Sequence, residues 1–251
     1  MDALNQLSTS ATVEIFVGDL SELEETLAAD VQELAHAALA ARGVFTIALC
    51  GGSVATHFFP RLARAPIDWS RADFFWVDER AVPPTDPESN YSVAASLWLE
   101  PASVPDARLH RMRAEDPDLQ RAATIYEQEL TSIAGTPPQL DLVLLGVGPD
   151  GHIASLFPGR PISQRPNHFV EVVDHAPKPP PRRLTLTLPV LAGARSVAVV
   201  ALGAPKAAAI RRALDRASDG PLERLLFSAT RLRLLLDTAA ASLLPAHHRP
   251  G

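Results

Sequence analysis

The stretch that decides the fold is Asp141-Leu-Val-Leu-Leu145, followed by the loop Gly146-Val-Gly-Pro-Asp150-Gly-His152. Its apolar run is unbroken, which is typical of a strand covered on both faces. Similar runs predict further strands at 44–49, 74–77, 169–173, 184–188, 197–202 and 232–236. So many buried strands in one chain indicate a central sheet with a layer on each side.

Helical patterns lie between these runs. The longest is predicted from about Leu20 to Arg42, where Ser21 and Glu24 have the spacing of a capping box. Others are predicted at 54–63, from a cap at 116 to about 134, and at 205–217. The alternation predicts an α/β fold with a mostly parallel, doubly wound, Rossmann-like sheet and helices on both faces. No convincing linker interrupts it, so we expect one domain over residues 1–251.

The composition excludes several classes of protein. The chain has 251 residues, 47% hydrophobic and 21% charged, as in ordinary globular proteins. Its net charge of −6 offers no basic field for nucleic acid. No run approaches the roughly 18 apolar residues of a membrane span. A single cysteine, Cys50, and an N-terminal segment without signal-peptide features predict a cytoplasmic location.

Ligands of parallel sheets bind beyond the carboxyl ends of the strands. After the run at 44–49 come Gly51, Gly52 and Ser53, which lead into a helix and suit a phosphate cradle. A tight turn without a ligand is an equal alternative. The turn also resembles a nucleophile elbow at Ser53, but no acid and histidine occur in a recognisable setting. For Cys50, a buried structural role is favoured over a nucleophilic one.

Charged residues follow two other runs. Asp78 and Arg80 end the run at 74–77, and Asn90 follows a proline-rich loop. These groups form either a surface salt bridge or the mouth of a site, and their position favours a site. Arg183 and Lys206 are either solvated charges or ligands of an anion. A lysine in the first turn of a helix opposes the dipole, which makes an anionic ligand a reasonable partner for Lys206.

The loop after the quoted strand contains G-x-G-x-x-G, the pattern of a dinucleotide site. Prolines at 158, 161 and 166 prevent the long crossover helix that such a site requires. Asp150 lies two residues before His152 instead, which indicates a general acid/base pair. The other histidines lack metal-ligand spacing, so we predict no metal.

Three segments resemble the 6-phosphogluconolactonase branch of the glucosamine/galactosamine-6-phosphate isomerase superfamily. They are LLGVGPDGHIASLFPG (144–159), WVDERAVPPTDPESNY (76–91) and RLTLTLPVLAGARSVAVVALGAPKAAAI (183–210), within a resemblance from about 15 to 241. It implies a NagB/RpiA-like fold and cofactor-free hydrolysis of 6-phospho-D-glucono-1,5-lactone to 6-phosphogluconate, a step of the oxidative pentose phosphate pathway. Cys50, Val54 and Ala55 depart from the family's Ser, Thr and Pro.

The resemblance also implies roles for individual residues. His152 becomes the general base, oriented by Asp150. Asp78 and Arg80 line the site, where Arg80 stabilises charge on the reacting oxygens. Asn90 binds a sugar hydroxyl. The implied phosphate ligands are Gly51, Gly52, Ser53, Lys206 and Arg183, with its neighbour Arg182 left open as the alternative arginine. The implied partner is a small sugar phosphate; a monomer and a small homo-oligomer both stay open.

Two other functions are weighed against this one. Glucosamine-6-phosphate deaminases have a similar Asp-Gly-His loop but typically continue into Phe-Asn-Glu-Pro. The matching stretch here is Ser155-Leu-Phe-Pro158, which lacks the acid and favours a lactonase. A sugar-phosphate-sensing domain without catalysis is disfavoured, because little sequence precedes the first predicted helix to hold a DNA-binding module.

Overall fold

The structure, a computed structural model, describes residues 12–161 and 167–245. Its centre is a six-stranded sheet in the order β1-β9-β8-β5-β2-β3, and all neighbouring strands in it are parallel. The strands are β1 (Thr12–Gly18), β2 (Phe45–Leu49), β3 (Ala72–Trp76), β5 (Leu142–Gly146), β8 (Ser196–Ala201) and β9 (Arg231–Asp237). The quoted strand, β5, lies in the interior of this sheet, as its unbroken apolar run predicts.

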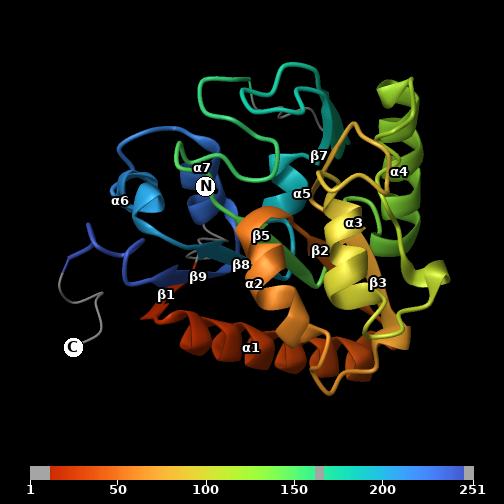
Figure 1. Ribbon diagram of the computed structural model, residues 1–251, viewed down its shortest axis with the longest axis horizontal. Coiled ribbons are helices and arrows are strands. Elements are labelled where there is room, and N and C mark those ends of the chain that lie inside the picture. Colours follow the sequence, from red (N-terminus) through yellow and green to blue (C-terminus); the bar gives the residue numbers. More distant parts are fainter. Residues whose placement is uncertain (1–11, 162–166, 246–251) are drawn as a thin grey trace, which may run out of the picture.

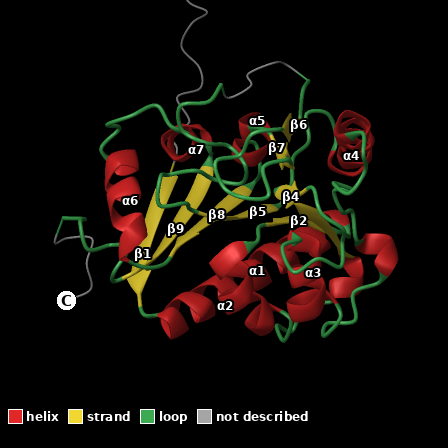
Figure 2. Ribbon diagram, turned by 45° about the horizontal axis from the view of Figure 1, so that its top comes forward, coloured by secondary structure: helices red, strands yellow, loops and turns green. Residues whose placement is uncertain are grey.

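Helices cover both faces of the sheet. They are α1 (Leu20–Arg42), α2 (Gly52–Leu62), α3 (Asn90–Ala94), α4 (Leu119–Ala134), α5 (Leu188–Ala192), α6 (Ala207–Leu214) and α7 (Pro221–Ser228). Figure 2 shows α1, α2 and α3 on one side of the strands, with α4, α5 and α7 on the other. The doubly wound α/β fold is therefore confirmed. None of the helices in the described ranges is long and apolar enough to cross a membrane.

A second, antiparallel sheet was not foreseen from the sequence. Its order is β4-β7-β6, formed by β4 (Asp78–Arg80), β6 (Val170–Val173) and β7 (Arg183–Leu186). The runs at 169–173 and 184–188 are strands as predicted, but they do not join the central sheet. The connection between them is short and contains four prolines, so it cannot form the crossover helix that a parallel pair needs. The chain turns back and pairs antiparallel.

Further details differ from the predictions, and the short helices α3, α5 and α7 were not predicted at all. The capping box of α1 is formed by Asp19 and Glu22, each side chain accepting from the other's backbone N–H, and not by Ser21 and Glu24. Helix α4 starts two residues later than expected, because the Asp118 side chain caps it. Strand β1 was missed, since it is an edge strand whose side chains are mostly half-buried and make no long apolar run.

A buried histidine connects the central sheet to α4. His110 Nε2 lies 3.1 Å from Asp73 Oδ1 on β3, and its Nδ1 lies 2.7 Å from Glu129 Oε1 on α4. The ring stacks on Phe75 at a centroid distance of 4.7 Å. Burial works to lower the pKa of His110, but the hydrogen bonds and charges of the two carboxylates outweigh it and raise the pKa to about 9. The imidazole is therefore a cation at neutral pH.

This cation predicts a pH-dependent contribution to stability. A pKa raised on folding stabilises fully below the unfolded value near 6.5, and the stabilisation is lost as the pH rises through about 9. We expect His110→Gln to lower the free energy of unfolding at pH 6 by at most about 3 kcal/mol, with the deficit shrinking by pH 9.5. Urea denaturation of both proteins across this range measures it. A deficit independent of pH would contradict the charged imidazole.

Candidate active site

One cavity of about 170 Å³ gathers nine of the ten residues singled out from the sequence. It opens at the carboxyl ends of β2 and β5, which are neighbours in the central sheet (Figure 1). The nine are Gly51, Gly52, Ser53, Asp78, Arg80, Asn90, His152, Arg183 and Lys206, and the tenth, Asp150, is hydrogen-bonded to His152. A larger hollow of about 690 Å³ beside Pro161 contains none of them.

The N-terminus of α2 forms one wall of the cavity. The residue before the helix, Gly51, provides no side-chain cap, so the first backbone N–H groups of α2 are available to an anion. Gly51 has a second role, because a Cβ there would lie 1.8 Å from Asn90 Oδ1. Only glycine lets the Asn90 side chain pack this closely against the start of α2.

A buried carboxylate organises the segment that brings Asn90 to the cavity. Glu79 Oε1 accepts from the backbone N–H groups of Arg80 and Asn90, and Oε2 accepts from Ser89 Oγ and the Tyr91 N–H. Burial raises the pKa of Glu79, although these four hydrogen bonds oppose the rise. Sequence reasoning assigned no role to Glu79 and so missed the carboxylate that shapes the loop from 80 to 91.

Asp78 connects three separate segments. Its Oδ1 accepts from Asn90 Nδ2 at 3.1 Å, and its Oδ2 accepts from Ser155 Oγ at 2.6 Å. Arg183 Nη1 lies 3.9 Å from the same Oδ2. The carboxylate is 5% exposed. In this arrangement Asp78 holds the walls of the cavity together, while the catalytic role predicted for it stays a prediction.

His152 is held by its own loop. Asp150 Oδ1 lies 2.5 Å from His152 Nδ1 and also accepts from the His152 backbone N–H at 3.3 Å. The Gly148 N–H donates to the His152 carbonyl at 2.8 Å, and a Cβ on Gly148 would lie 1.9 Å from His152 Nδ1. A glycine is thus required for the ring to fold against the loop. Nothing in residues 12–161 and 167–245 hydrogen-bonds Nε2.

The protonation states follow from burial and from this contact. Burial lowers the pKa of His152 below 6.5, although the hydrogen bond and charge of Asp150 act to raise it. For Asp150, burial acts to raise the pKa, but the hydrogen bond and charge of His152 lower it overall. At neutral pH the pair is therefore a carboxylate beside a neutral imidazole. With Nδ1–H donating to Asp150, the free lone pair is on Nε2.

An aromatic ring packs against the imidazole on its other side. The Phe157 and His152 rings have centroids 4.9 Å apart, and the Arg183 guanidinium lies 5.8 Å from the Phe157 centroid. The described part of the segment from 152 to 169 contains no helix, which is consistent with rejecting the dinucleotide pattern. Pro166, one of the three prolines used in that argument, lies outside the described residues.

The sequence and the fold are both similar to those of known proteins. A family model described as glucosamine-6-phosphate isomerases/6-phosphogluconolactonase matches residues 18–233. The chain belongs to this family. A 6-phosphogluconolactonase of Streptomyces coelicolor is 41% identical over 225 residues, covering 83% of this chain and 85% of the relative. A solved 6-phosphogluconolactonase from Trypanosoma brucei is 28% identical with a TM-score of 0.83, covering 94% of this chain and all of that one.

A monomeric glucosamine-6-phosphate deaminase shares the fold, with a TM-score of 0.79 at 20% identity over 92% of this chain and 99% of the deaminase. The resemblance inferred from the three sequence segments is thus confirmed at the level of the family. The fold alone does not separate the two activities, because proteins of both names superpose on it. The distinction between them has to come from the side chains around His152.

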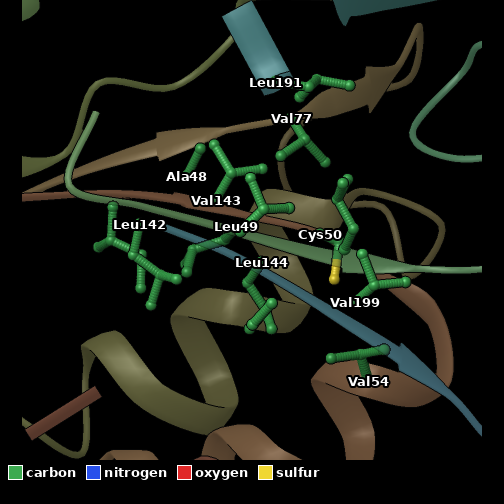
Figure 3. Packing of buried hydrophobic residues seen from close by; sticks show 14 of the residues in the cluster. Ala48, Leu49, Cys50, Val54, Val77, Leu142, Val143, Leu144, Leu191 and Val199 are labelled. Carbon is green, nitrogen blue, oxygen red and sulfur yellow. The ribbon is translucent and has the colours of Figure 1, made fainter. Parts of the chain in front are cut away.

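The single cysteine is buried, although it borders the cavity. Cys50 is 5% exposed and packs near Val54 and Val199 (Figure 3). Burial, followed by the charge of Asp78, raises the pKa of its thiol, so the reactive thiolate is disfavoured. The buried interpretation of Cys50 is confirmed. In the described part of the chain, no group of three or more His, Cys, Asp or Glu side chains is placed to hold a metal ion.

The two candidate arginines are separated by the structure. Arg182 is exposed and pairs with Asp174 at 3.3 Å, whereas Arg183 is 4% exposed and lines the cavity. Sequence reasoning missed one cation of the cavity, Lys178, which lies in the proline-rich connection before β7. No motif marks this lysine. Its place became visible only through the antiparallel pairing of β6 with β7.

The Asp150–His152 pair predicts a titration. We expect His152 to titrate below pH 6.5 in the wild type and lower still in Asp150→Asn, because both contributions of Asp150 raise the imidazole pKa. NMR of the histidine ring protons against pH measures this shift. His110, titrating near 9 in both proteins, is the internal control. A His152 pKa that is unchanged or higher in Asp150→Asn would contradict the arrangement.

Proposed function

We propose that this chain is a 6-phosphogluconolactonase, which hydrolyses 6-phospho-D-glucono-1,5-lactone to 6-phosphogluconate in the oxidative pentose phosphate pathway, with His152 as the general base. The observation that carries the proposal is a neutral imidazole, bound through Nδ1 to Asp150, in one cavity with an uncapped helix N-terminus and lysine ammonium groups. The names of the relatives support the same reaction. A single domain in the cytoplasm, without a cofactor, is part of the proposal.

The chemistry needs one proton carrier. His152 Nε2 takes a proton from water as the water oxygen attacks the C1 carbonyl, and a tetrahedral intermediate forms. When the bond between C1 and the ring oxygen breaks, the imidazolium returns the proton to that oxygen, which becomes the C5 hydroxyl. The product carboxylic acid then ionises. Asp150 keeps the imidazole in the tautomer that leaves Nε2 free, and stabilises the cation formed midway.

The phosphate at the far end of the substrate positions the reacting carbon. The first N–H groups of α2, at Gly52 and Ser53, combine with the Lys206 ammonium to bind an anion in the cavity. Binding at the phosphate holds the substrate with C1 facing His152, and the binding energy gained there contributes to kcat/KM. Arg80 and Asn90 line the same cavity and are assigned to the sugar and carbonyl oxygens.

Phe157 favours a lactonase over a deaminase. A deaminase of this fold would be expected to have its glutamate where this chain has Phe157, and the ring here lies 4.9 Å from that of His152. An apolar ring cannot transfer the second proton that ring opening and amine release require, whereas lactone hydrolysis needs only His152. Lactone consumption, measured with the spontaneous rate subtracted, tests the proposal. Ammonia release from glucosamine 6-phosphate would overturn it.

Loss of the base should separate catalysis from binding. We expect His152→Ala to lower kcat by about 100-fold or more, the usual effect of removing a general base. Its affinity for 6-phosphogluconate should stay within a few-fold, because the phosphate ligands are intact. The exposed His175, which lies outside this cavity, provides the control His175→Ala, with kcat unchanged. Near-normal turnover in His152→Ala would show that another group activates the water.

Loss of a phosphate ligand should weaken binding, in contrast to loss of the base, which lowers kcat. We expect Lys206→Ala to weaken binding of 6-phosphogluconate about tenfold or more, since a hydrogen bond from a charged donor is removed. Isothermal titration calorimetry measures the affinity. Arg211→Ala is the matched control, because Arg211 is a cation on the adjoining helix that pairs with Asp215 away from the cavity. An unchanged affinity in Lys206→Ala would show that Lys206 does not bind the phosphate.

A further inference from the structure

The chain has 21 arginines but only two lysines, Lys178 and Lys206. The two are far apart in the sequence, yet both line the cavity that contains His152. Apart from histidine, every other basic side chain of this protein is an arginine. Both lysine ammonium groups nevertheless border the same cavity. Resting on the function proposed above, we propose that Lys178 is a second direct ligand of the substrate's phosphate, acting together with Lys206.

Arg183 fixes the backbone that carries Lys178. Its Nε donates to the Pro180 carbonyl at 3.0 Å, and its Nη2 donates to the Lys178 carbonyl at 3.0 Å and the Pro179 carbonyl at 3.4 Å. The guanidinium is itself buried, with Phe157 beneath it. The Lys178 side chain is exposed, but its main chain is attached to the wall of the cavity. This attachment reduces the entropy lost when the ammonium binds an anion.

The Arg183 guanidinium is largely engaged by protein atoms, whereas Nε of Arg80, the other guanidinium of the cavity, has no hydrogen-bond partner among the described residues. Arg80 Nη1 donates to the Glu88 carbonyl, and three of the Arg183 donors are directed at the carbonyls of the 178–180 segment or at Ser155 Oγ. The ammonium groups are not engaged in this way. Within the described ranges, neither Lys178 nor Lys206 has a carboxylate within 4.0 Å. Arg183 therefore serves mainly to build the wall of the cavity, and the two lysine ammonium groups are left for the phosphate.

The two ammonium groups also affect each other. Both ammonium groups line one cavity, and burial, and after it the charge of Lys178, lowers the pKa of Lys206, so each positive charge disfavours the other. A phosphate dianion between them offsets both positive charges. Ammonium suits this ligand, because it is a compact charge with three rotatable donors that adapts to phosphate oxygens in several geometries.

The alternative role for Lys178 is to stabilise the oxyanion at the reacting carbon, which is the other end of the substrate from the phosphate. Its charge also lowers the pKa of His152, which places it within electrostatic range of the reacting carbon. A lysine that stabilised the oxyanion there would act on the transition state and leave the binding of product unchanged. A phosphate ligand affects ground-state and transition-state binding equally, so its loss raises KM and Kd and leaves kcat nearly intact.

The substitution Lys178→Gln separates these roles. We expect it to raise KM for the lactone, and Kd for 6-phosphogluconate and for inorganic phosphate, by about tenfold to hundredfold, with kcat within about threefold. Arg182→Gln is the matched control, because it removes a positive charge from the same connection at a residue that faces Asp174 and not the cavity. An unchanged Kd, or a loss of kcat at unchanged Kd, overturns the proposal.

The scarcity of lysine permits a second, direct measurement. Reductive methylation with ¹³C-formaldehyde keeps the charge and labels only the two lysines and the N-terminus, and Lys178→Gln assigns the signals. Inorganic phosphate should shift both lysine signals. If lactone is hydrolysed and only Lys206 responds, the role of Lys178 is wrong and the proposed function stands. If both respond but no lactone is hydrolysed, the phosphate site stands and the proposed reaction is wrong.

Discussion

The antiparallel pairing of β4 with β7 holds the candidate site together. It places Arg80 opposite Arg183 and Asp78 opposite Thr185, joining segments about a hundred residues apart in the chain. Strand β4 follows β3 after a single residue, so the small sheet is attached to the edge of the large one where its strands end. Without this pairing, the parallel sheet would offer the two loops after β2 and β5 but no wall facing them.

Three carboxylates turn that pairing into a defined cavity. Asp78 receives Asn90 and Ser155, Glu79 ties the loop that carries Asn90, and Asp150 holds His152. Asp78 and Glu79 are buried and surrounded by donors, because a buried carboxylate is tolerated only when its oxygens are hydrogen-bonded, whereas Asp150 is exposed. The acids of the cavity therefore serve to position other groups. Two arginines and two lysines line the same cavity, so positive charge surrounds the space that these acids help to shape.

Much of the site could be predicted from the sequence for a simple geometric reason. The strands of a parallel sheet end at one edge, so residues after the runs at 44–49 and 142–145 had to meet there, and Gly51 and His152 do. The second sheet was missed because runs of apolar residues do not reveal which sheet they join, although the short, proline-rich connection before residue 183 excludes a crossover helix and was visible in the sequence. Lys178 depends on that sheet for its position, so no local pattern indicated it.

Errors at the helix ends have a different cause. Asp19 and Ser21 are both good caps, and so are residues 116 and 118, so the choice is made by which position lets the following residues reach the core. The cluster around His110 was invisible for a third reason. A histidine becomes a buried cation only when two carboxylates from separate elements reach it, and Asp73 and Glu129 meet it through tertiary packing alone.

The charge of the whole protein and the charge of its cavity have opposite signs. A net charge of −6 repels a sugar phosphate at long range, so attraction has to arise within a short distance, where salt and water screen it least. In the proposed phosphate site the two lysines and the start of α2 supply it, while Arg183 beside them directs its Nε and Nη2 donors at backbone carbonyls. Binding then depends on a fixed frame more than on the protein's overall field. Part of that frame is the small sheet that brings Asp78 and Lys178 to the cavity where the loop after β5 places His152.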